Sequence, residues 1–218
     1  MFICAGESET FTFAKPLGIG MVDMSINLTK LCMEEKPSFL FFVGTAGSYG
    51  EHNIFDIVES KTASNIENGF FNAKAYTPLD NVISAYGGAN STSPSVPNLQ
   101  RSRNASSLDG SHVSRETIVN SSNYITTDES LCKHYLSNNI YLENMEFFAV
   151  LKVAKAFNIP VAGAFIVTNY CNAKAHQTFL DNHTEAMKRL TKYIQASQEE
   201  TPILTEDNDD EFPDYQFP

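Results

Sequence analysis

Tryptophan is absent from this 218-residue chain, and basic side chains are scarce. Fifteen Lys and Arg residues stand against 26 Asp and Glu residues, which gives a formal net charge of -11. This balance excludes a broad surface for nucleic acid or for an anionic membrane. The longest apolar runs, such as 39–43 and 161–167, are far shorter than the roughly 20 residues of a membrane span. The sequence therefore predicts neither a nucleic-acid partner nor a membrane partner.

The four cysteines, Cys4, Cys32, Cys132 and Cys171, lie far apart in the sequence. No pair has the spacing of a zinc site or of a redox motif, and no histidine lies at zinc-ligand distance, so we expect neither a metal nor an organic cofactor. Scattered thiols in apolar surroundings are typical of reduced core residues, which favours a cytoplasmic location. The first residues show no basic segment ahead of an apolar one, so no signal peptide is expected.

The negative charge is unevenly distributed along the chain. Eight acids and no base follow Lys192, and taking their charge from the total of -11 leaves about -3 for the rest. We therefore expect a folded domain at 1–198 and an acidic, disordered tail at 199–218. Within the domain, residues 86–114 carry turn formers without periodicity, which predicts a loop-rich insertion.

Short apolar runs alternate with helical patterns along the domain. This alternation predicts a mostly parallel sheet with helices on both faces, which is an α/β fold. Three polar clusters, 6–9, 44–48 and 168–169, follow expected strands, and ligands bind at the carboxyl ends of strands in such sheets. The order of elements therefore nominates a small-molecule site there. The expected strands are 2–5, 14–17, 39–43, 54–60, 117–121 and 160–168, and the expected helices are 21–35, 128–136, 145–157 and 175–196.

Several short motifs follow one another in the order found in one enzyme superfamily. They are Gly18-Ile-Gly-Met-Val22, the segment 36–47, Asp56-Ile-Val58, the segment 118–125, Asn144-Met-Glu146 and the segment 166–169. In these residues the chain resembles the nucleoside phosphorylase and nucleosidase superfamily, over most of 2–196 apart from 86–114. That superfamily includes purine nucleoside phosphorylases, uridine phosphorylases and methylthioadenosine/S-adenosylhomocysteine nucleosidases. The resemblance implies a three-layer αβα domain with a mixed central sheet, and a homo-oligomer that is a dimer or a trimer of dimers.

The chemistry of this superfamily explains the residue types that match. Cleaving the N-glycosidic bond of a purine nucleoside builds positive charge on the ribose and negative charge on the base, so a site must stabilise both. By resemblance, Glu146 accepts hydrogen bonds from the ribose 2′ and 3′ hydroxyls, and Met145 packs against the sugar. Tyr124 stacks on the base, and Ile125 belongs to the same base-binding segment.

Two further residues bear on which purine is bound. Asn169 lies 24 positions after Met145, at a point where many members carry an aspartate that protonates purine N7 as a general acid. An asparagine donates a hydrogen bond to N7 but no proton. In this respect the chain resembles the trimeric purine nucleoside phosphorylases, which prefer the 6-oxopurine nucleosides inosine and guanosine. His183 lies in a similar Asn-His setting, which implies a contact with the ribose 5′ hydroxyl.

The group that accepts the ribosyl unit stays open at this stage. The resemblance places Gly6, Thr45 and Gly47 on the side of the phosphate or the water. Phosphorylases hold phosphate with arginine, but here Phe42 occupies the position before the 43–45 segment where the hexameric enzymes carry one. A phosphate would then depend on backbone N–H groups or on a residue from elsewhere.

Acids in 6–9 favour water as the acceptor instead. Nucleosidases use a glutamate after the first strand to activate water, and Glu9 is the best positional match, with Glu7 as the alternative. We therefore expect first a purine nucleoside phosphorylase that cleaves 6-oxopurine nucleosides, and second a hydrolytic purine nucleosidase whose water is activated by Glu9. A catalytically impaired purine- or nucleoside-binding protein is a third hypothesis, and a protein whose acidic tail recruits a partner is a fourth.

Overall fold

The computed structural model describes residues 1–71, 73–85, 113–114 and 117–199. The expected insertion at 86–114 lies outside these residues except for its last two. The expected tail at 199–218 lies outside them except for Glu199. Within the described residues, no helix has the length and apolarity needed to cross a membrane.

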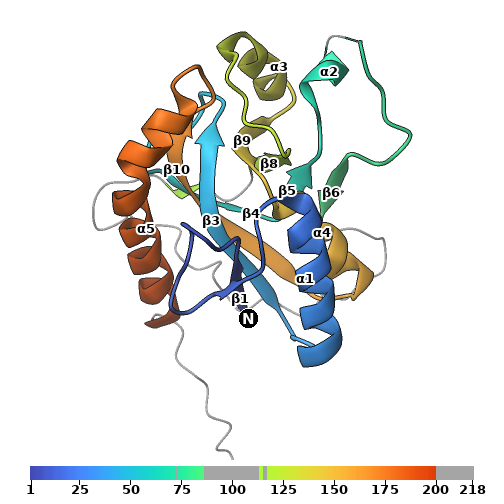
Figure 1. The fold of residues 1–218 in the computed structure, drawn as a ribbon, viewed down its shortest axis with the longest axis vertical. Coiled ribbons are helices and arrows are strands. Elements are labelled where there is room, and N and C mark those ends of the chain that lie inside the picture. The colour runs from blue at the N-terminus through green and yellow to red at the C-terminus, as the bar shows by residue number, and fades with distance from the viewer. Residues whose placement is uncertain (72, 86–112, 115–116, 200–218) are drawn as a thin grey trace, which may run out of the picture.

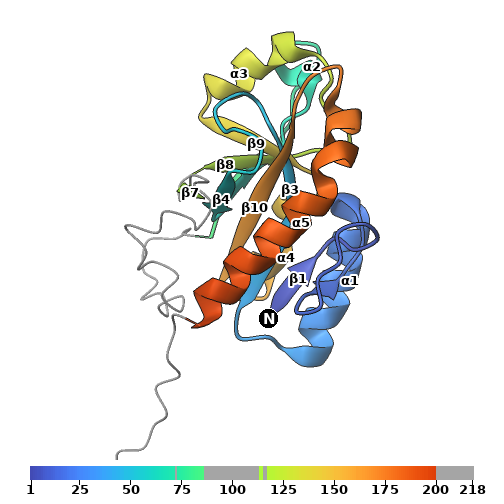
Figure 2. The same ribbon diagram turned by 90° about the vertical axis from the view of Figure 1, so that its left-hand side faces the viewer.

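The described chain forms three layers around one mixed sheet (Figure 1, Figure 2). Helix α5 covers one face of the central strands, and helices α1 and α4 cover the other. The strand order is β6-β5-β8-β9-β3-β10-β4-β7, with β1 beside β3 and β2 beside β1. The strands are β1 Phe2–Cys4, β2 Lys15–Pro16, β3 Leu40–Ser48, β4 Ile57–Ser60, β5 Thr62–Ser64, β6 Val82–Ser84, β7 Val113–Ser114, β8 Ile118–Ser121, β9 Ile140–Asn144 and β10 Val161–Tyr170. The helices are α1 Gly20–Glu35, α2 Asn68–Phe71, α3 Cys132–Leu136, α4 Phe147–Ala156 and α5 Ala175–Glu199. The predicted three-layer αβα architecture is confirmed.

The central strands are apolar without interruption because successive side chains enter two different cores. In β3, Leu40 and Phe42 pack toward α1 and α4, whereas Phe41 and Val43 pack toward α5. A strand that is buried on both faces needs apolar residues at every position. This explains why 39–43 and 160–168 could be recognised as strands from sequence.

The sheet is mixed, as the resemblance implies, and most of its described strand pairs are parallel, as the alternation of elements predicts. Strand β9 runs antiparallel to β3 and β4 runs antiparallel to β10, whereas β1 and β10 run parallel to β3. The sequence expectation differs from the structure at β9 and at 44–48. Strand β9 was not expected, since its last two residues, Glu143 and Asn144, are polar yet buried. The segment 44–48 is the second half of β3 and is buried throughout, so it is not a loop after the strand.

Helix α4 begins later than its apolar pattern indicates. The pattern predicts a helix over 145–157, but Met145 and Glu146 precede the first helical residue, Phe147. The side chain of Asn144 causes this start, because its Oδ1 accepts hydrogen bonds from the backbone N–H groups of Glu146 at 2.8 Å and Phe147 at 2.9 Å. Glu146 is therefore the residue directly before α4 and does not lie in its first turn.

One edge of β3 has two different neighbours. At its start, Phe41 and Phe42 pair with β1, and at its end, Gly47 and Ser48 pair with β9. Among the described strands, none pairs with 43–46 on this edge. The backbone of Thr45 is therefore free to meet side chains in the gap between β1 and β9. Such a divergence of neighbouring strands is where α/β sheets bind ligands.

Candidate active site

Thr45 makes three contacts with side chains in the gap. Its backbone N–H donates a 3.0 Å hydrogen bond to Glu9 Oε2, and its hydroxyl donates to Glu9 Oε1. Its carbonyl oxygen accepts a 3.1 Å hydrogen bond from Asn144 Nδ2. Since Asn144 Oδ1 also accepts from the backbone N–H groups of Glu146 and Phe147, the same amide fixes Thr45 and the residues at the start of α4.

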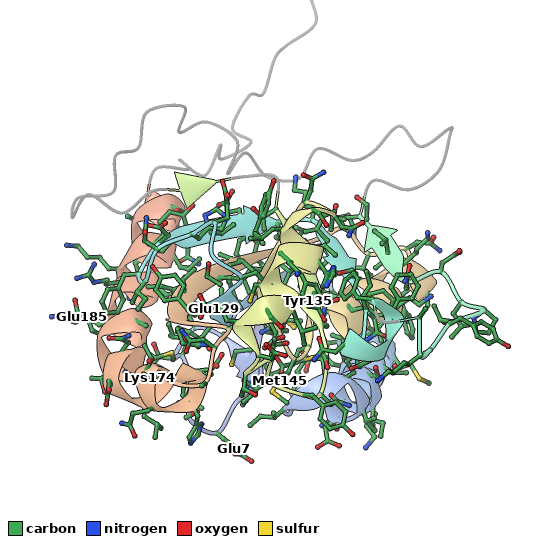
Figure 3. All side chains as sticks on the ribbon, turned by 90° about the horizontal axis from the view of Figure 1, so that it is seen from above. Glu7, Glu129, Tyr135, Met145, Lys174 and Glu185 are labelled. Carbon is green, nitrogen blue, oxygen red and sulfur yellow. The ribbon has the colours of Figure 1, made fainter. Side chains whose placement is uncertain are left out.

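The turn after β1 delivers Glu9 to this gap. Gly6 has φ +106°, a conformation that favours glycine, and its carbonyl oxygen accepts a 2.9 Å hydrogen bond from the backbone N–H of Glu9. A side chain at Gly44 would come within 3.1 Å of Glu9 Oε2, so this glycine leaves the space that the carboxylate fills. Glu7 is exposed and lies at the rim of the molecule, directed away from it (Figure 3). The structure thus brings Glu9 to the gap and leaves Glu7 outside.

Glu146 is a buried carboxylate that faces the same gap. Its side chain accepts a 2.8 Å hydrogen bond from the backbone N–H of Gly20, at the start of α1. Burial, with a smaller contribution from the negative charge of Glu9, raises the pKa of Glu146 to about 7. The two acids are therefore close enough to influence each other, and at neutral pH a proton can be exchanged between Glu146 and its surroundings.

Asn169 presents an amide on the next strand. A bulge near Thr168 interrupts the pairing of β10 with β3, and Asn169 lies opposite Gly47. The hydroxyl of Thr168 donates to Asn169 Oδ1 at 2.9 Å, which orients the side chain. One N–H of the NH2 group donates to the carbonyl oxygen of Tyr170 at 3.2 Å, and the other N–H remains as a donor for a ligand. This NH2 group lies 3.0 Å from the position that a side chain at Gly47 would take, so only glycine leaves the amide room.

The segment after β8 brings the expected base-contacting residues to the surface. Tyr124 is 74% exposed and Ile125 is 50% exposed, so neither is core filling. The side chain of Asn123 accepts a 3.1 Å hydrogen bond from the backbone N–H of Met21, which fastens this segment to the start of α1 beside Gly20. Tyr124 is therefore free to meet a ligand, with its backbone held next to the group that contacts Glu146.

Met145 and His183 complete the expected set. Figure 3 views the molecule from the end at which β3 and β10 finish, and there Met145 lies between α1 and α5. His183 lies on α5, where its ring packs against Phe179 at a centroid distance of 5.1 Å, and its buried Nε2 has no hydrogen-bond partner among the described residues. The preceding Asn182 donates a 2.9 Å hydrogen bond to the carbonyl of Thr168, so this turn of α5 is fixed beside the strand end that carries Asn169.

The residues of the candidate site come from segments between Gly6 and His183. A comparison with known protein families covers the same part of the chain. The family model of the Phosphorylase superfamily matches residues 6–199. The chain belongs to the phosphorylase superfamily. No curated protein matches the sequence.

Several solved structures resemble this chain in fold, although their sequence identity to it is low. The 5′-methylthioadenosine/S-adenosylhomocysteine nucleosidase of Neisseria meningitidis, in complex with methylthio-immucillin-A, has a TM-score of 0.70 and 14% identity over 91% of this chain and 97% of that one. A mutant Helicobacter pylori MTAN with 5′-methylthioadenosine in its active site has a TM-score of 0.68 and 14% identity over 86% and 79%. A mutant futalosine hydrolase of Helicobacter pylori has a TM-score of 0.67 and 13% identity over 91% and 97%. These likenesses confirm the nucleoside phosphorylase-like fold.

Gly20, Asn123 and Asn144 lie in the motifs that the sequence analysis singled out, but sequence reasoning did not assign them their roles in holding the site together. Gly20 supplies a backbone N–H to Glu146, Asn123 fastens the Tyr124 segment, and Asn144 fixes Thr45. Glu143 is a further buried acid near the end of β9. The signal was present in two places: a second glycine directly before a helix, and adjacent Glu and Asn residues at the end of an otherwise apolar run.

Basic side chains take no part in the gap as described. Arg189 is the one arginine within the described residues, and its guanidinium stacks 4.4 Å from the ring centre of Phe55 and pairs with Glu185 on α5. The arginines at 101, 103 and 115 lie outside the described residues. Within the described part of the chain, no group of His, Cys, Asp or Glu side chains could hold a metal ion.

Proposed function

We propose that this phosphorylase-superfamily chain is a purine nucleosidase, in which Glu9 activates the water that attacks the ribose. The observation that carries the proposal is the double hydrogen bond between Glu9 and Thr45. Thr45 is the residue expected to bind phosphate, and both of its donors point at a carboxylate. A phosphate entering here would meet the negative charge of Glu9 instead of free N–H and O–H groups. A neutral water molecule meets a hydrogen-bond acceptor.

The reaction follows from the roles of the two acids. The bond between ribose C1′ and purine N9 breaks, and its electron pair leaves with the purine. Glu9 takes a proton from water while the water oxygen bonds to C1′, which yields free ribose. Ionised Glu146 accepts hydrogen bonds from the ribose hydroxyls and stabilises the positive charge on the sugar. The purine receives a proton from Glu9 or from solvent, because Asn169 has none to give.

The base side supports 6-oxopurine nucleosides as substrates. The remaining N–H of the Asn169 amide can donate to purine N7 or to the 6-oxo oxygen, which is an acceptor, whereas the 6-amino group of adenosine is a donor. This residue and His183 are also the features that favour a purine nucleoside phosphorylase, which is the second candidate function. If the site binds purines without cleaving them, the lack of a proton donor at Asn169 is the reason, and the protein is then a nucleoside-binding protein.

We also propose that the protein forms a homo-oligomer in the cytoplasm. Apolar side chains of α1 project to the surface: Val22 is 63% exposed and Met33 is 65% exposed. The start of α1, where Val22 lies, adjoins the exposed Tyr124 segment, because Asn123 accepts a hydrogen bond from the backbone of Met21. A second copy of the chain that covers this face would bury these side chains. Light scattering is expected to give at least twice the 24.2 kDa chain mass, and a monomer at micromolar concentration would contradict the proposal.

Release of base from inosine, guanosine, adenosine and 5′-methylthioadenosine tests the function. We expect hypoxanthine and guanine to appear at a rate that does not depend on phosphate between zero and millimolar concentration. A rate that saturates with phosphate, with ribose 1-phosphate as the product, would support the phosphorylase instead. Tight purine binding without any turnover would support the binding protein.

A further inference from the structure

Glu143 is a buried carboxylate that the proposed reaction does not use. It lies on β9, is 8% exposed, and is in register with Gly47 on β3. Gly47 is in turn the partner of Asn169 on β10. Residues that pair across adjacent strands project from the same face of a sheet, so Glu143 lies in one row with the glycine and the amide on the base side.

Three hydrogen bonds satisfy this carboxylate, and two of them come from one residue. Thr126 donates its backbone N–H to Glu143 Oε1 at 2.9 Å and its hydroxyl to Oε2. The hydroxyl of Tyr49, the residue that directly follows β3, donates to Oε2 at 2.9 Å. A carboxylate accepts about four hydrogen bonds, so little capacity remains for a ligand, and Glu143 acts through Thr126.

Thr126 is the one buried residue in 123–128, since its neighbours on both sides are exposed. Tyr124 and Ile125, which precede it, have little to pack against within the described chain. The backbone on their far side is held by Ser122, whose hydroxyl oxygen accepts a 3.1 Å hydrogen bond from the N–H of Tyr124. The bonds to Glu143 are therefore what ties the exit of this segment to the sheet.

We propose that Glu143 is a positioning residue that clamps the segment 122–127 so that Tyr124 and Ile125 face the purine. The clamp itself rests on the contacts above, whereas its effect on catalysis rests on the proposed function. A buried carboxylate that loses these donors leaves a charge or a polar group unpaired, so the clamp is strong while it is intact. Removing it frees the base-binding segment and leaves Glu9 and Glu146 in place.

The absence of tryptophan gives a direct readout of the clamp. In a Tyr124→Trp background the single indole reports on the segment, and quenching by acrylamide measures its mobility. Glu143→Gln and Thr126→Val are expected to raise quenching and lower the fluorescence anisotropy. Tyr49→Phe is the matched control, since it removes a hydrogen bond to the same carboxylate but none to the segment. Equal quenching in all three variants would overturn the clamp, and Thr126→Val carries the test if Glu143→Gln does not fold.

Steady-state kinetics with Tyr124 intact test the link to the purine. Loss of one or two hydrogen bonds that preorganise the segment is expected to raise KM for inosine about tenfold with kcat changed far less. Tyr49→Phe is expected to leave KM unchanged. A proportional loss of active enzyme, seen as lower kcat at constant KM, would mean a purely structural role. If no nucleoside is cleaved at all, the proposed function fails, and the quenching experiment still decides the clamp.

Discussion

The carboxylate of Glu9 accepts hydrogen bonds from both the backbone N–H and the hydroxyl of Thr45, with 3.0 Å between Glu9 Oε2 and the backbone nitrogen. Thr45 lies where β1 has left the edge of β3 and β9 has not yet joined it. An acid from the turn after β1 thus occupies the donors that would hold a phosphate oxygen. This one contact is the reason that we propose an activated water molecule, and not phosphate, at Thr45.

Replacing Glu9 by glutamine should abolish most of the turnover. Glu9→Gln keeps the size of the side chain and one acceptor for Thr45, but it removes the carboxylate that we propose takes the proton from water. We expect kcat to fall about a hundredfold or more, with KM changed little. Glu7→Gln is the control, because Glu7 is exposed two residues away, and its kinetics should match the native enzyme. Equal losses in both variants would remove Glu9 from the mechanism.

Activity should depend on the ionisation of Glu146. Burial raises its pKa to about 7, and only the ionised carboxylate accepts hydrogen bonds from both ribose hydroxyls. The value of kcat/KM for inosine is therefore expected to rise with pH through about 7. Glu146→Gln should lower kcat/KM at least tenfold, since hydrogen bonds to charged groups are worth about 1.5–3 kcal/mol, and it should flatten the profile. A profile unchanged by the substitution would contradict the assignment.

The same group should make stability depend on pH. The pKa of Glu146 is higher in the folded protein than in the unfolded chain, so folding favours its protonated form. The resulting contribution to stability is fully present below about pH 4.5. Its contribution is lost as pH rises through about 7, because the charge is then buried. Glu146→Gln should therefore gain in relative Tm between pH 5 and pH 8. A difference in Tm that stays constant over this range would show that Glu146 titrates normally.

Asn169 should decide the preference between purines. Asn169→Asp introduces a group that can carry a proton to purine N7, so cleavage of adenosine is expected to rise relative to inosine. Asn169→Ala should lower kcat/KM for both nucleosides. The ratio of the two kcat/KM values measures the preference. If the ratio is the same in the native protein and in Asn169→Asp, this amide does not set specificity.

Gly20 should be intolerant of a side chain. It has φ +80°, and a Cβ there would lie 3.0 Å from Asn123 Oδ1, the atom that fastens the Tyr124 segment to α1. Gly20→Ala is expected to lower stability by about 1–2 kcal/mol and to lower activity beyond that loss, because the N–H to Glu146 moves. Gly50→Ala is the matched control, since Gly50 also has a positive φ of +124° but its Cβ would meet its nearest atom at 3.9 Å. It should lower stability without lowering kcat/KM in the folded protein.

The layers of the fold could be predicted from sequence because burial leaves a direct mark on composition. The central strands β3 and β10 enter two cores at once and are therefore continuously apolar. Strand β9 left no such mark, because Glu143 and Asn144 use their side chains to bind Thr126 and Thr45 within the interior. Buried polar residues look like surface residues until their partners are known.

The candidate site was predicted in its residue types but not in its connections. Glu9, Glu146 and Asn169 could be proposed from their motifs, and in the structure Glu9 and Glu146 lie close enough for the charge of Glu9 to raise the pKa of Glu146. That Glu9 binds Thr45, and that Gly20 and Asn144 hold the arrangement, depends on contacts between segments separated by 36 to 126 positions. No local pattern carries such information. The sequence ranked phosphorolysis ahead of hydrolysis, and the hydrogen bonds between Glu9 and Thr45 are the reason that we now propose hydrolysis first.

The origin of the oxygen on the released sugar tests the central claim most directly. Inosine is incubated with the protein in ¹⁸O-labelled water that contains millimolar phosphate, and the sugar product is analysed by mass spectrometry. If Glu9 activates water, free ribose will carry one ¹⁸O atom at C1′ before exchange, and phosphate will change neither its amount nor its label. Ribose 1-phosphate that carries no label from water would contradict the account.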